Sequence, residues 1–429
     1  MLLTEYRLDL VIQALRTILP LEHPADTALR YFFQAERIGS NERALVAETV
    51  FGVLRHRLYL EYSCGEQTTP RRLALAYWVK FGGYNLRELT PLLKATESEW
   101  LVHVKSIKIN ELELSIQAEL PHWIIDQLRP YYSAEEILAI GQSMQQAAGL
   151  DLRVNTHLAT RNEVLLGLQA EGVSAEATPY SPIGIRVKGK PALNKSPMFL
   201  GGKFEVQDEG SQLLGFLLAP KRNEMVVDFC AGAGGKSLML GAMMNSQGRL
   251  YALDVSEKRL ANLKPRLKRS GLSNLQPQLI AHENDVKVKR LAGKIDRVLV
   301  DAPCSGLGTL RRNPDLKFRQ SPQSVAELTQ KQRNILAAAA KLLKNGGRLV
   351  YATCSLLHEE NQNIVETFLA AHPEFKLLPA GEALAQQKIP LEMGNYLQLL
   401  PQKHGTDGFF AAMMERQTSS TETSLPDAE

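Results

Sequence analysis

The chain has 429 residues, of which 44% are hydrophobic and 22% are charged, and its formal net charge is +4 at pH 7. This composition excludes a chain that is disordered throughout, and no run of residues is apolar enough to span a bilayer. The N-terminus does not resemble a signal peptide, because Glu5 and Asp9 interrupt the stretch that would have to be apolar. The four cysteines form no CxxC pair, which argues against a zinc site or a disulfide framework. We therefore expect two or three domains in a cytoplasmic protein without a metal site, and the mild positive charge permits an acidic partner such as nucleic acid.

Apolar residues recur at three- and four-residue spacing from Asp9 to about Trp100, as in ERALVAETVFGVLRHRLYLEY. This periodicity is typical of amphipathic helices that pack on one another. The pattern weakens over residues 105–121, where SIKINELELSIQAELP indicates a connecting strand or loop, and HWIIDQLRPYY then begins a new helix. The sequence thus predicts a helical domain over residues 1–120.

A small α+β module is predicted over residues 121–205. The run DLRVNTHLATRNEVLLGLQAEGV joins a short β-rich segment to a Thr-capped helix, and IGIRVKG follows as a second strand. Several basic residues of this module either face a phosphate backbone or are scattered, solvated charges. They are Arg153, Arg186, Lys188, Lys190 and Lys195.

From Gly210 onward, short apolar strands alternate with helices. The strands are EMVVDFC, RLYALDV, PQLIAHE, DRVLVDAP and RLVYATCS, and FKLL, LQLL and DGFFAAMME can supply the last ones. Such alternation predicts an α/β domain over residues 206–416, a doubly wound, mostly parallel sheet with helices on both faces. The polar tail, residues 417–429, is expected to be disordered.

A glycine-rich loop follows the first of these strands, in DFCAGAGGKSLML. Glycines let the backbone approach a ligand, and the start of the next helix offers free amide hydrogens, so a nucleotide-like cofactor docks at this place in a doubly wound sheet. A purely structural turn is the alternative, and the missing GxGxxG spacing argues against a nicotinamide. The expected cofactor-binding residues here are Cys230, Ala231, Gly232, Ala233, Gly234, Gly235 and Lys236.

Acidic residues stand at the ends of the next two strands. Asp254 ends the second strand and can accept hydrogen bonds from both hydroxyls of a ribose, and Arg259 follows in the same DVSEKRL segment, which we include in the cofactor site. Asp285 follows the third strand, where it either meets the edge of an adenine or caps the next helix.

Two cysteines follow the fourth and fifth strands, Cys304 in DAPCSGLG and Cys354 in YATCSLLHEEN. The carboxyl ends of parallel strands converge on one crevice, which brings both thiols beside the cofactor. A lone buried cysteine usually behaves as a small hydrophobic residue, which is the simplest interpretation of Cys64 and the alternative to cofactor contact for Cys230. A pair on adjacent strand ends indicates chemistry instead.

Together these motifs resemble the RsmB/NOP/Sun family of RNA cytosine-5 methyltransferases. The resemblance covers about residues 120–416 and rests on EVQDEGSQL, DFCAGAGGK, DVSEKRL, DRVLVDAPCSGLGTLRRNPDLKF, YATCSLLHEEN and HGTDGFF. The N-terminal run NERALVAETVFGVLR is similar to the NusB-like RNA-binding domain of the bacterial branch that acts on 16S ribosomal RNA, in a shortened form. One departure is Ala233, where many members have proline.

The resemblance implies a class I, Rossmann-like fold, S-adenosyl-L-methionine as methyl donor and RNA, ribosomal RNA above all, as partner. It assigns Cys354 as the covalent nucleophile at carbon 6 of cytosine, and Cys304 as the group that assists loss of the carbon 5 proton and release. Asp301 then bonds the cytosine ring near N3 and borders the cofactor, and Lys236 supports the thiolate. Nothing in the sequence requires more than a monomer.

Two alternatives remain from the residues alone. The first is a catalytically inactive RNA-binding assembly factor, and the intact cysteines, Asp301 and the glycine loop argue against it. The second is a nicotinamide-dependent oxidoreductase, and the missing GxGxxG spacing argues against that. Two further segments could face RNA. These are Arg311, Arg312 and Asn313, which resemble the family's substrate side, and the predicted helix KRLANLKPRLKR with its six basic residues, which is otherwise a solvated face.

Overall fold

The computed structural model describes residues 2–189 and 191–418. The chain divides into two compact units, one formed by Met1–Ala147 with Thr309–Pro322 and one by Ala148–Gly308 with Gln323–Glu429. Lys190 and residues 419–429, most of the tail expected to be disordered, lie outside the described residues. Within residues 2–189 and 191–418, no helix is both long and apolar enough to cross a membrane.

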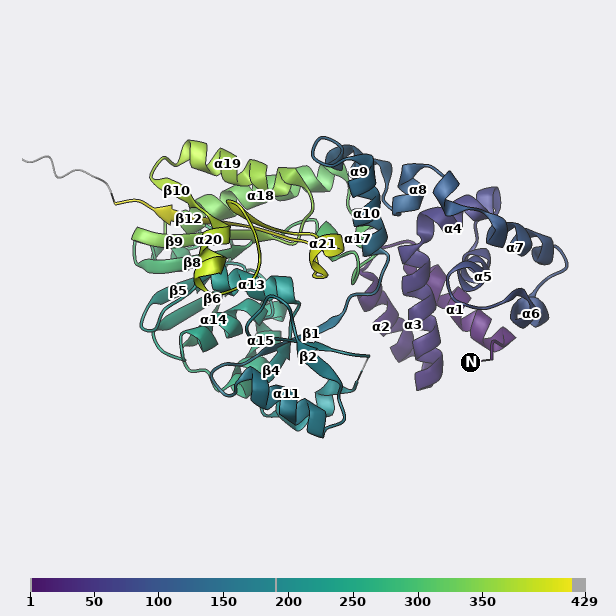
Figure 1. The fold of residues 1–429 in the computed structure, drawn as a ribbon, viewed down its shortest axis with the longest axis horizontal. Helices are drawn as coiled ribbons and strands as arrows, with labels where there is room; N and C mark the ends of the chain where they lie inside the picture. The colour runs from purple at the N-terminus through teal and green to yellow at the C-terminus, as the bar shows by residue number, and fades with distance from the viewer. Residues whose placement is uncertain (1, 190, 419–429) are drawn as a thin grey trace, which may run out of the picture. The chain divides into compact units, whose positions relative to one another are not determined.

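The first unit is helical (Figure 1). Its helices are α1 (Glu5–Ile18), α2 (Ala25–Glu36), α3 (Ser40–Arg55), α4 (Arg57–Cys64), α5 (Pro70–Lys80), α6 (Leu86–Leu89), α7 (Glu97–Ser106), α8 (Leu114–Ala118), α9 (His122–Leu128), α10 (Ala134–Met144) and α17 (Leu316–Arg319). Side chains at helical spacing form its core, in which the Trp78 indole donates to the Thr49 hydroxyl at 2.9 Å. This compact unit extends to Ala147 and includes α9 and α10, whereas the predicted helical domain ends at residue 120. The predicted domain boundary at residue 120 stays a prediction.

The strand or loop expected over residues 105–121 is short helical structure instead. A 3-10 turn covers Ile109–Glu111, and α8 follows it. The alternation in KINELELSI suggests a strand, but a strand must pair its backbone groups with a neighbour. Among the described residues, the helical unit contains no strand to pair with.

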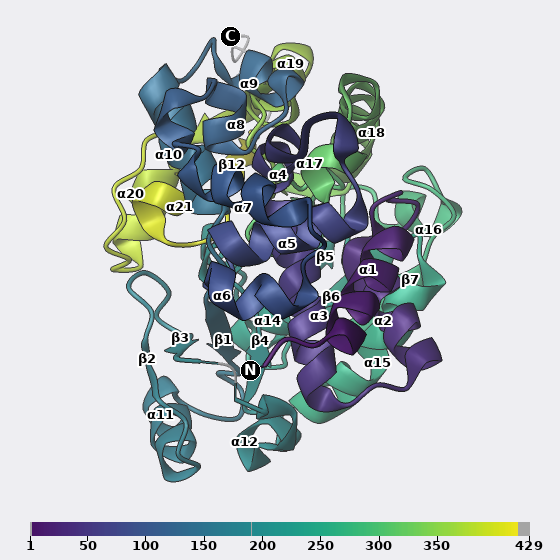
Figure 2. The same ribbon diagram turned by 90° about the vertical axis from the view of Figure 1, so that its right-hand side faces the viewer.

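The second unit begins with a small antiparallel sheet of order β2-β3-β1-β4, with α11 and α12 as its helices (Figure 2). Its elements are β1 (Leu150–Val154), α11 (Arg161–Ala170), β2 (Ala175–Ala177), β3 (Gly184–Val187), α12 (Pro197–Leu200) and β4 (Phe204–Val206). The Thr-capped helix and the IGIRVKG strand are confirmed by α11 and β3. Two of the basic residues are not available to a phosphate backbone: Arg153 is buried and donates to the Gln207 side chain, and Arg186 forms a two-pronged ion pair with Asp151.

The larger sheet has the order β10-β12-β9-β8-β5-β6-β7, and β11 also pairs with β12. The central strands are parallel: β5 (Met225–Asp228), β6 (Arg249–Asp254), β7 (Leu275–Leu279), β8 (Ile295–Asp301) and β9 (Leu343–Thr353). The antiparallel strands at one edge are β10 (Phe375–Leu378), β11 (Tyr396–Leu399) and β12 (Phe409–Arg416). The predicted doubly wound, mostly parallel sheet is therefore confirmed.

Helices cover both faces of this sheet because successive residues of each strand point to opposite sides. Val226 of β5 packs on the side of α13, α14 and α15, whereas Val227 packs on the side of α18 and α19 (Figure 1). The helices are α13 (Glu209–Leu218), α14 (Gly235–Met243), α15 (Glu257–Ser270), α16 (Val286–Lys289), α18 (Pro322–Ala340), α19 (Gln362–Ala371), α20 (Ala380–Gln386) and α21 (Pro401–His404). The chain leaves β5 in the middle of the sheet, where the strand order reverses, and ligands bind at such points.

Candidate active site

A cavity of about 700 Å³ lies at the carboxyl ends of β5, β6, β8 and β9. It contains most of the predicted site residues. Those that line it are Cys230, Ala231, Gly232, Ala233, Gly235, Lys236, Asp254, Arg259, Asp301, Cys304 and Cys354. The sequence did not indicate several other lining residues, namely Gln207, Ser211, Asp228, Ile280, Glu283 and Lys331.

The glycine loop takes backbone conformations that favour glycine at two positions, Gly232 at φ +56° and Gly234 at φ +79°. A Cβ on Gly234 would lie 2.2 Å from a methyl carbon of Leu263, so this glycine permits close packing on α15 and does not itself line the cavity. Arg266 of α15 donates to the Ala233 carbonyl at 2.6 Å and holds the loop from behind. The start of α14, with its free amide hydrogens, therefore faces the cavity.

Asp254 joins the end of β6 to this loop. Its carboxylate accepts hydrogen bonds from the amides of Gly232 and Ser256, each at 2.7 Å. A carboxylate has about four acceptor positions, so both oxygens can still accept from a ligand. Two neighbouring hydroxyls, such as those of a ribose, match this arrangement.

Asp285 does not line the cavity. Its half-buried carboxylate accepts from the amides of Ala281 and Lys287, each at 2.8 Å, and caps α16. The capping alternative is thus observed, and contact with an adenine stays a prediction. From the same loop, Ile280 and Glu283 reach the cavity. Ile280 follows β7 directly, and an apolar side chain there suits the flat face of a base.

Lys236 and Asp301 form an ion pair inside the cavity, with 2.6 Å between Nζ and a carboxylate oxygen. Burial lowers the pKa of the Lys236 ammonium, but the attraction of Asp301 and of Asp228 outweighs it, and the net pKa is raised. Lys236 therefore stays protonated and lies 5.8 Å from the centre of the Phe409 ring. Its positive charge is fixed at Asp301 beside the cysteines.

Asp228, at the end of β5, is the most deeply buried acid of the cavity. One of its oxygens accepts from the Ser237 hydroxyl at 2.6 Å, and the other has no hydrogen-bond partner among the described residues. Burial raises the pKa of this carboxyl to about 6. An unsatisfied buried acceptor costs stability, so this oxygen suits the positively charged group of a ligand.

The two cysteine sulfurs lie 3.5 Å apart. Cys304 follows β8 and Cys354 follows β9, and these strands are parallel neighbours with Asp301 opposite Ala352. The hydrogen bond to the Cys354 sulfur, followed by burial, raises the pKa of Cys304 well above its usual value. With its pKa raised in this way, the Cys304 thiol keeps its proton near neutral pH, since two thiols in contact do not readily hold two negative charges.

Two further basic segments are expected from the sequence to face RNA. Arg311, Arg312 and Asn313 belong to Thr309–Pro322, which is part of the helical unit, and they do not line the cavity. The predicted basic helix is α15, and it is not only a solvated face. Its Arg266 and Arg269 form ion pairs with Glu205.

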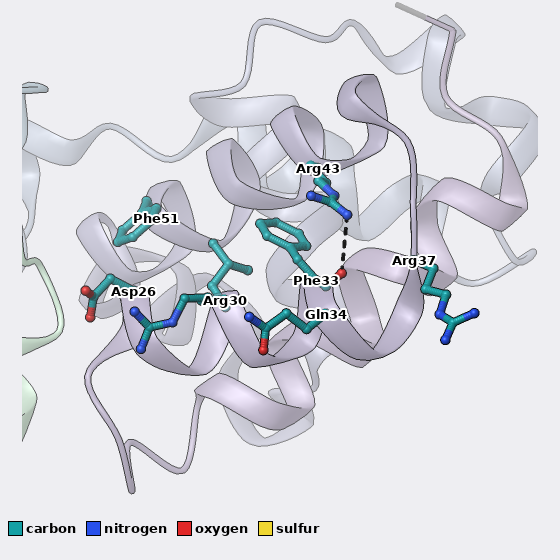
Figure 3. A pocket seen from close by; sticks show the side chains of 8 residues that line it. Asp26, Arg30, Phe33, Gln34, Arg37, Arg43 and Phe51 are labelled. Carbon is teal, nitrogen blue, oxygen red and sulfur yellow. Dashed lines mark hydrogen bonds between the residues drawn. The ribbon is translucent and has the colours of Figure 1, made fainter. Parts of the chain in front are cut away.

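A second hollow, of about 560 Å³, lies on α2 and α3 of the helical unit (Figure 3). It is lined by Asp26, Leu29, Arg30, Phe33, Gln34, Arg37, Arg43 and Phe51. Its guanidinium groups do not converge: Arg43 donates to backbone carbonyls of Ile38 and Phe33, and Arg37 points away. This hollow contains no nucleophile and no glycine loop, so the carboxyl edge of the large sheet is the better candidate for an active site.

Known proteins are similar to this chain in both sequence and fold. Residues 215–415 match a family model described as 16S rRNA methyltransferase RsmB/F, and residues 120–194 match one described as an RsmF/B-like, ferredoxin-like domain. The "Probable ribosomal RNA small subunit methyltransferase B" of Synechocystis sp. is 31% identical, with 95% of this chain and 99% of that chain covered. The "Ribosomal RNA small subunit methyltransferase B" of Sodalis glossinidius is 32% identical, with coverage of 89% and 92%.

A solved structure titled "Crystal Structure of PH0851" superposes with a TM-score of 0.79 and 26% identity, over 97% of this chain and 100% of that chain. The similarity thus covers residues of both units, including the sheet that carries the cysteines. The resemblance found in the motifs is confirmed: the chain belongs to the RsmB/NOP/Sun methyltransferase family, in its bacterial branch.

Proposed function

We propose that this protein uses S-adenosyl-L-methionine to methylate carbon 5 of a cytosine in 16S ribosomal RNA, with Cys354 as covalent nucleophile. The contact between the sulfurs of Cys354 and Cys304, in one cavity with the glycine loop, carries this proposal. The names of the relatives, which are ribosomal RNA small subunit methyltransferases, support the RNA substrate. A cytoplasmic location and a monomeric state are part of the same proposal.

The residues of the cavity fit S-adenosyl-L-methionine. The Asp254 carboxylate suits the ribose hydroxyls, and the start of α14 suits the carboxylate of the amino-acid moiety. The unpartnered oxygen of Asp228 suits its ammonium group, and Ile280 suits the adenine face. When bound, this molecule supplies an electrophilic methyl group.

Carbon 5 of cytosine is too weak a nucleophile to take a methyl group unaided. The thiolate of Cys354 adds to carbon 6, a sulfur–carbon bond forms, and the electron pair of the 5,6 double bond makes carbon 5 nucleophilic. Asp301 orients the ring near N3. The Lys236 ammonium, held 2.6 Å from Asp301, offsets the negative charge that the ring gains.

Cys304 acts after the methyl group has been added. The sulfur of Cys354 is then bound to carbon, so the hydrogen bond that raises the pKa of Cys304 is lost and Cys304 can release its own proton to water. It next accepts the proton from carbon 5. The 5,6 double bond forms again, the bond between sulfur and carbon 6 breaks, and its electron pair returns to Cys354.

Replacing Cys354 tests this assignment. Cys354→Ala should abolish methyl transfer while the affinity for S-adenosyl-L-methionine in an equilibrium titration stays unchanged, because Asp254 and the glycine loop remain. Bisulfite sequencing of ribosomal RNA from cells with the wild-type or variant protein identifies the modified cytosine. A variant that still methylates would overturn the role of Cys354, and an unmodified 16S RNA in wild-type cells would overturn the substrate.

A further inference from the structure

Glu360 lies between the two loops that carry the cysteines and does not line the cavity. It ends the 3-10 turn His358–Glu360 and is completely buried. One oxygen of its carboxylate accepts from the Ser305 amide at 2.8 Å. The other accepts from the hydroxyls of Ser305 and Ser355, each at 2.5 Å. One carboxylate thus binds the residue that directly follows each cysteine.

Neighbouring elements hold Glu360 in place. The Gln332 amide of α18 donates to its carboxylate at 3.0 Å and to the Pro303 carbonyl at 2.9 Å. From β9, the Tyr351 hydroxyl donates to the Glu360 backbone carbonyl at 2.7 Å. The position of this residue is therefore fixed by β9, by the loops that carry the cysteines and by α18.

A buried carboxylate is costly unless hydrogen bonds replace its water. Among the described residues Glu360 has no cationic partner, and the backbone and side-chain donors named above satisfy it instead. An apolar side chain would fill the space without this cost, so packing alone does not account for an acid here. Hydrogen bonds to a charged acceptor are short and directional, and they fix geometry well.

We propose that Glu360 is a positioning residue, whose carboxylate ties the loop after β8 to the loop after β9 and so keeps the sulfurs of Cys304 and Cys354 in contact. The proposal rests on the proposed function only in so far as the reaction uses both sulfurs. Two variants separate hydrogen bonding from charge. Glu360→Gln keeps the acceptor for the Ser305 amide and offers an NH₂ group to the serine hydroxyls, whereas Glu360→Ala removes the acceptor altogether.

The sulfur geometry can be measured without RNA. The full-length protein is treated with a diazene dicarboxamide oxidant, and the disulfide-linked peptide of Cys304 and Cys354 is followed by mass spectrometry. Wild type should form it readily because the sulfurs are already in contact. Glu360→Ala should form it about 10-fold more slowly, and Glu360→Gln at close to the wild-type rate, since disulfides need a narrow geometry.

A matched control removes a structural carboxylate at the amino end of β5, whereas the cysteines follow the carboxyl ends of β8 and β9. Glu224 precedes β5 and forms an ion pair with Arg297 at 2.6 Å. Glu224→Gln should lower stability without changing the rate of disulfide formation. An equal slowing in this control would show that Glu360→Ala acts through general loosening and would overturn the proposal.

Catalysis supplies the second readout. In Glu360→Ala, kcat for methyl transfer should fall by about 100-fold, the loss expected for a shift of ~1 Å, while KM stays near wild type and Glu360→Gln recovers most of the rate. If Glu360→Ala does not fold, Ser355→Ala removes one donor and should slow disulfide formation by a smaller factor. Wild-type disulfide rates in the folded variant would refute the positioning role. Slowed rates in a protein that proves unable to methylate RNA would refute only the proposed function.

Discussion

The buried ion pair between Lys317 and Glu119 gives a sharp prediction for the helical unit. Both side chains are almost fully buried, at 4% and 3% exposure. The Lys317 ammonium donates to the Glu119 carboxylate at 3.2 Å and to the carbonyls of Glu119 and Arg55 at 2.8 and 2.9 Å. Because Lys317 belongs to Thr309–Pro322, the stretch that follows the Cys304 loop, this pair fastens that stretch within the helical unit.

Lys317→Met should destabilise the unit by about 3–5 kcal/mol, the usual cost of leaving one partner of a buried pair without its counter-charge. Burial raises the pKa of Glu119 even with Lys317 present, and removing the cation raises it further. When a carboxyl group has a raised pKa in the folded state, the free energy of unfolding decreases as the pH rises through that pKa. The penalty should therefore be smaller at pH 5 than at pH 7.5, and Lys317→Met/Glu119→Gln should recover at least half of it.

The assay is urea unfolding followed by tryptophan fluorescence. The three tryptophans of the chain, Trp78, Trp100 and Trp123, all lie within Met1–Ala147, so their signal reports the helical unit. With a slope of about 2 kcal/mol per molar urea, the predicted loss shifts the midpoint by about 1.5–2.5 M. Lys108→Ala breaks the exposed pair with Glu111 and serves as control, with an expected loss below about 0.5 kcal/mol. Equal midpoint shifts in Lys317→Met and Lys108→Ala would show that the buried pair contributes no more to stability than an exposed one.

Three further predictions follow from individual residues. Burial lowers the pKa of His56 to about 3, so the unfolded chain binds a proton below pH 6.5 that the folded chain does not. The free energy of unfolding, measured with urea, should therefore fall by about 2 kcal/mol from pH 6.5 to 5 in wild type. His56→Gln should not show this fall. Burial raises the pKa of Asp228 to about 6, so titrated affinity for S-adenosyl-L-methionine should rise through pH 6, and a similar rise in Asp228→Asn would contradict its contact with the ammonium. Gly234→Ala should weaken cofactor binding more than Gly232→Ala, because only the former meets Leu263; equal titrated affinities would count against this packing argument.

The sequence predicts the sheet and the location of its site well, because the carboxyl ends of parallel strands share one edge. The spacing of apolar runs is sufficient to place Asp254, Cys304 and Cys354 at strand ends, and the structure brings all three to one cavity. Their chemical roles are not tested by this placement and stay part of the proposal.

Contacts between distant residues could not be predicted in this way. From the sequence, Arg153 is one of several basic residues that could face a phosphate backbone. In the structure its partner Gln207 follows another strand, and both side chains are buried. The motif HEEN gives no sign that Glu360 accepts hydrogen bonds from beside both cysteines. The alternating run before Leu120 suggests a strand, but in the described part of this unit there is no strand for it to pair with.

The division of work between the two sulfurs is tested most directly by mapping the covalent bond to RNA. Cys304→Ala is incubated with S-adenosyl-L-methionine and 16S RNA, the complex is isolated as a retarded band on a denaturing gel, and the digested protein is examined by mass spectrometry. This assignment of roles to the two sulfurs predicts a methylated cytidine attached to the peptide that contains Cys354, and no such peptide from Cys304→Ala/Cys354→Ala. A nucleotide attached at another residue, or no attached nucleotide in Cys304→Ala, would contradict it.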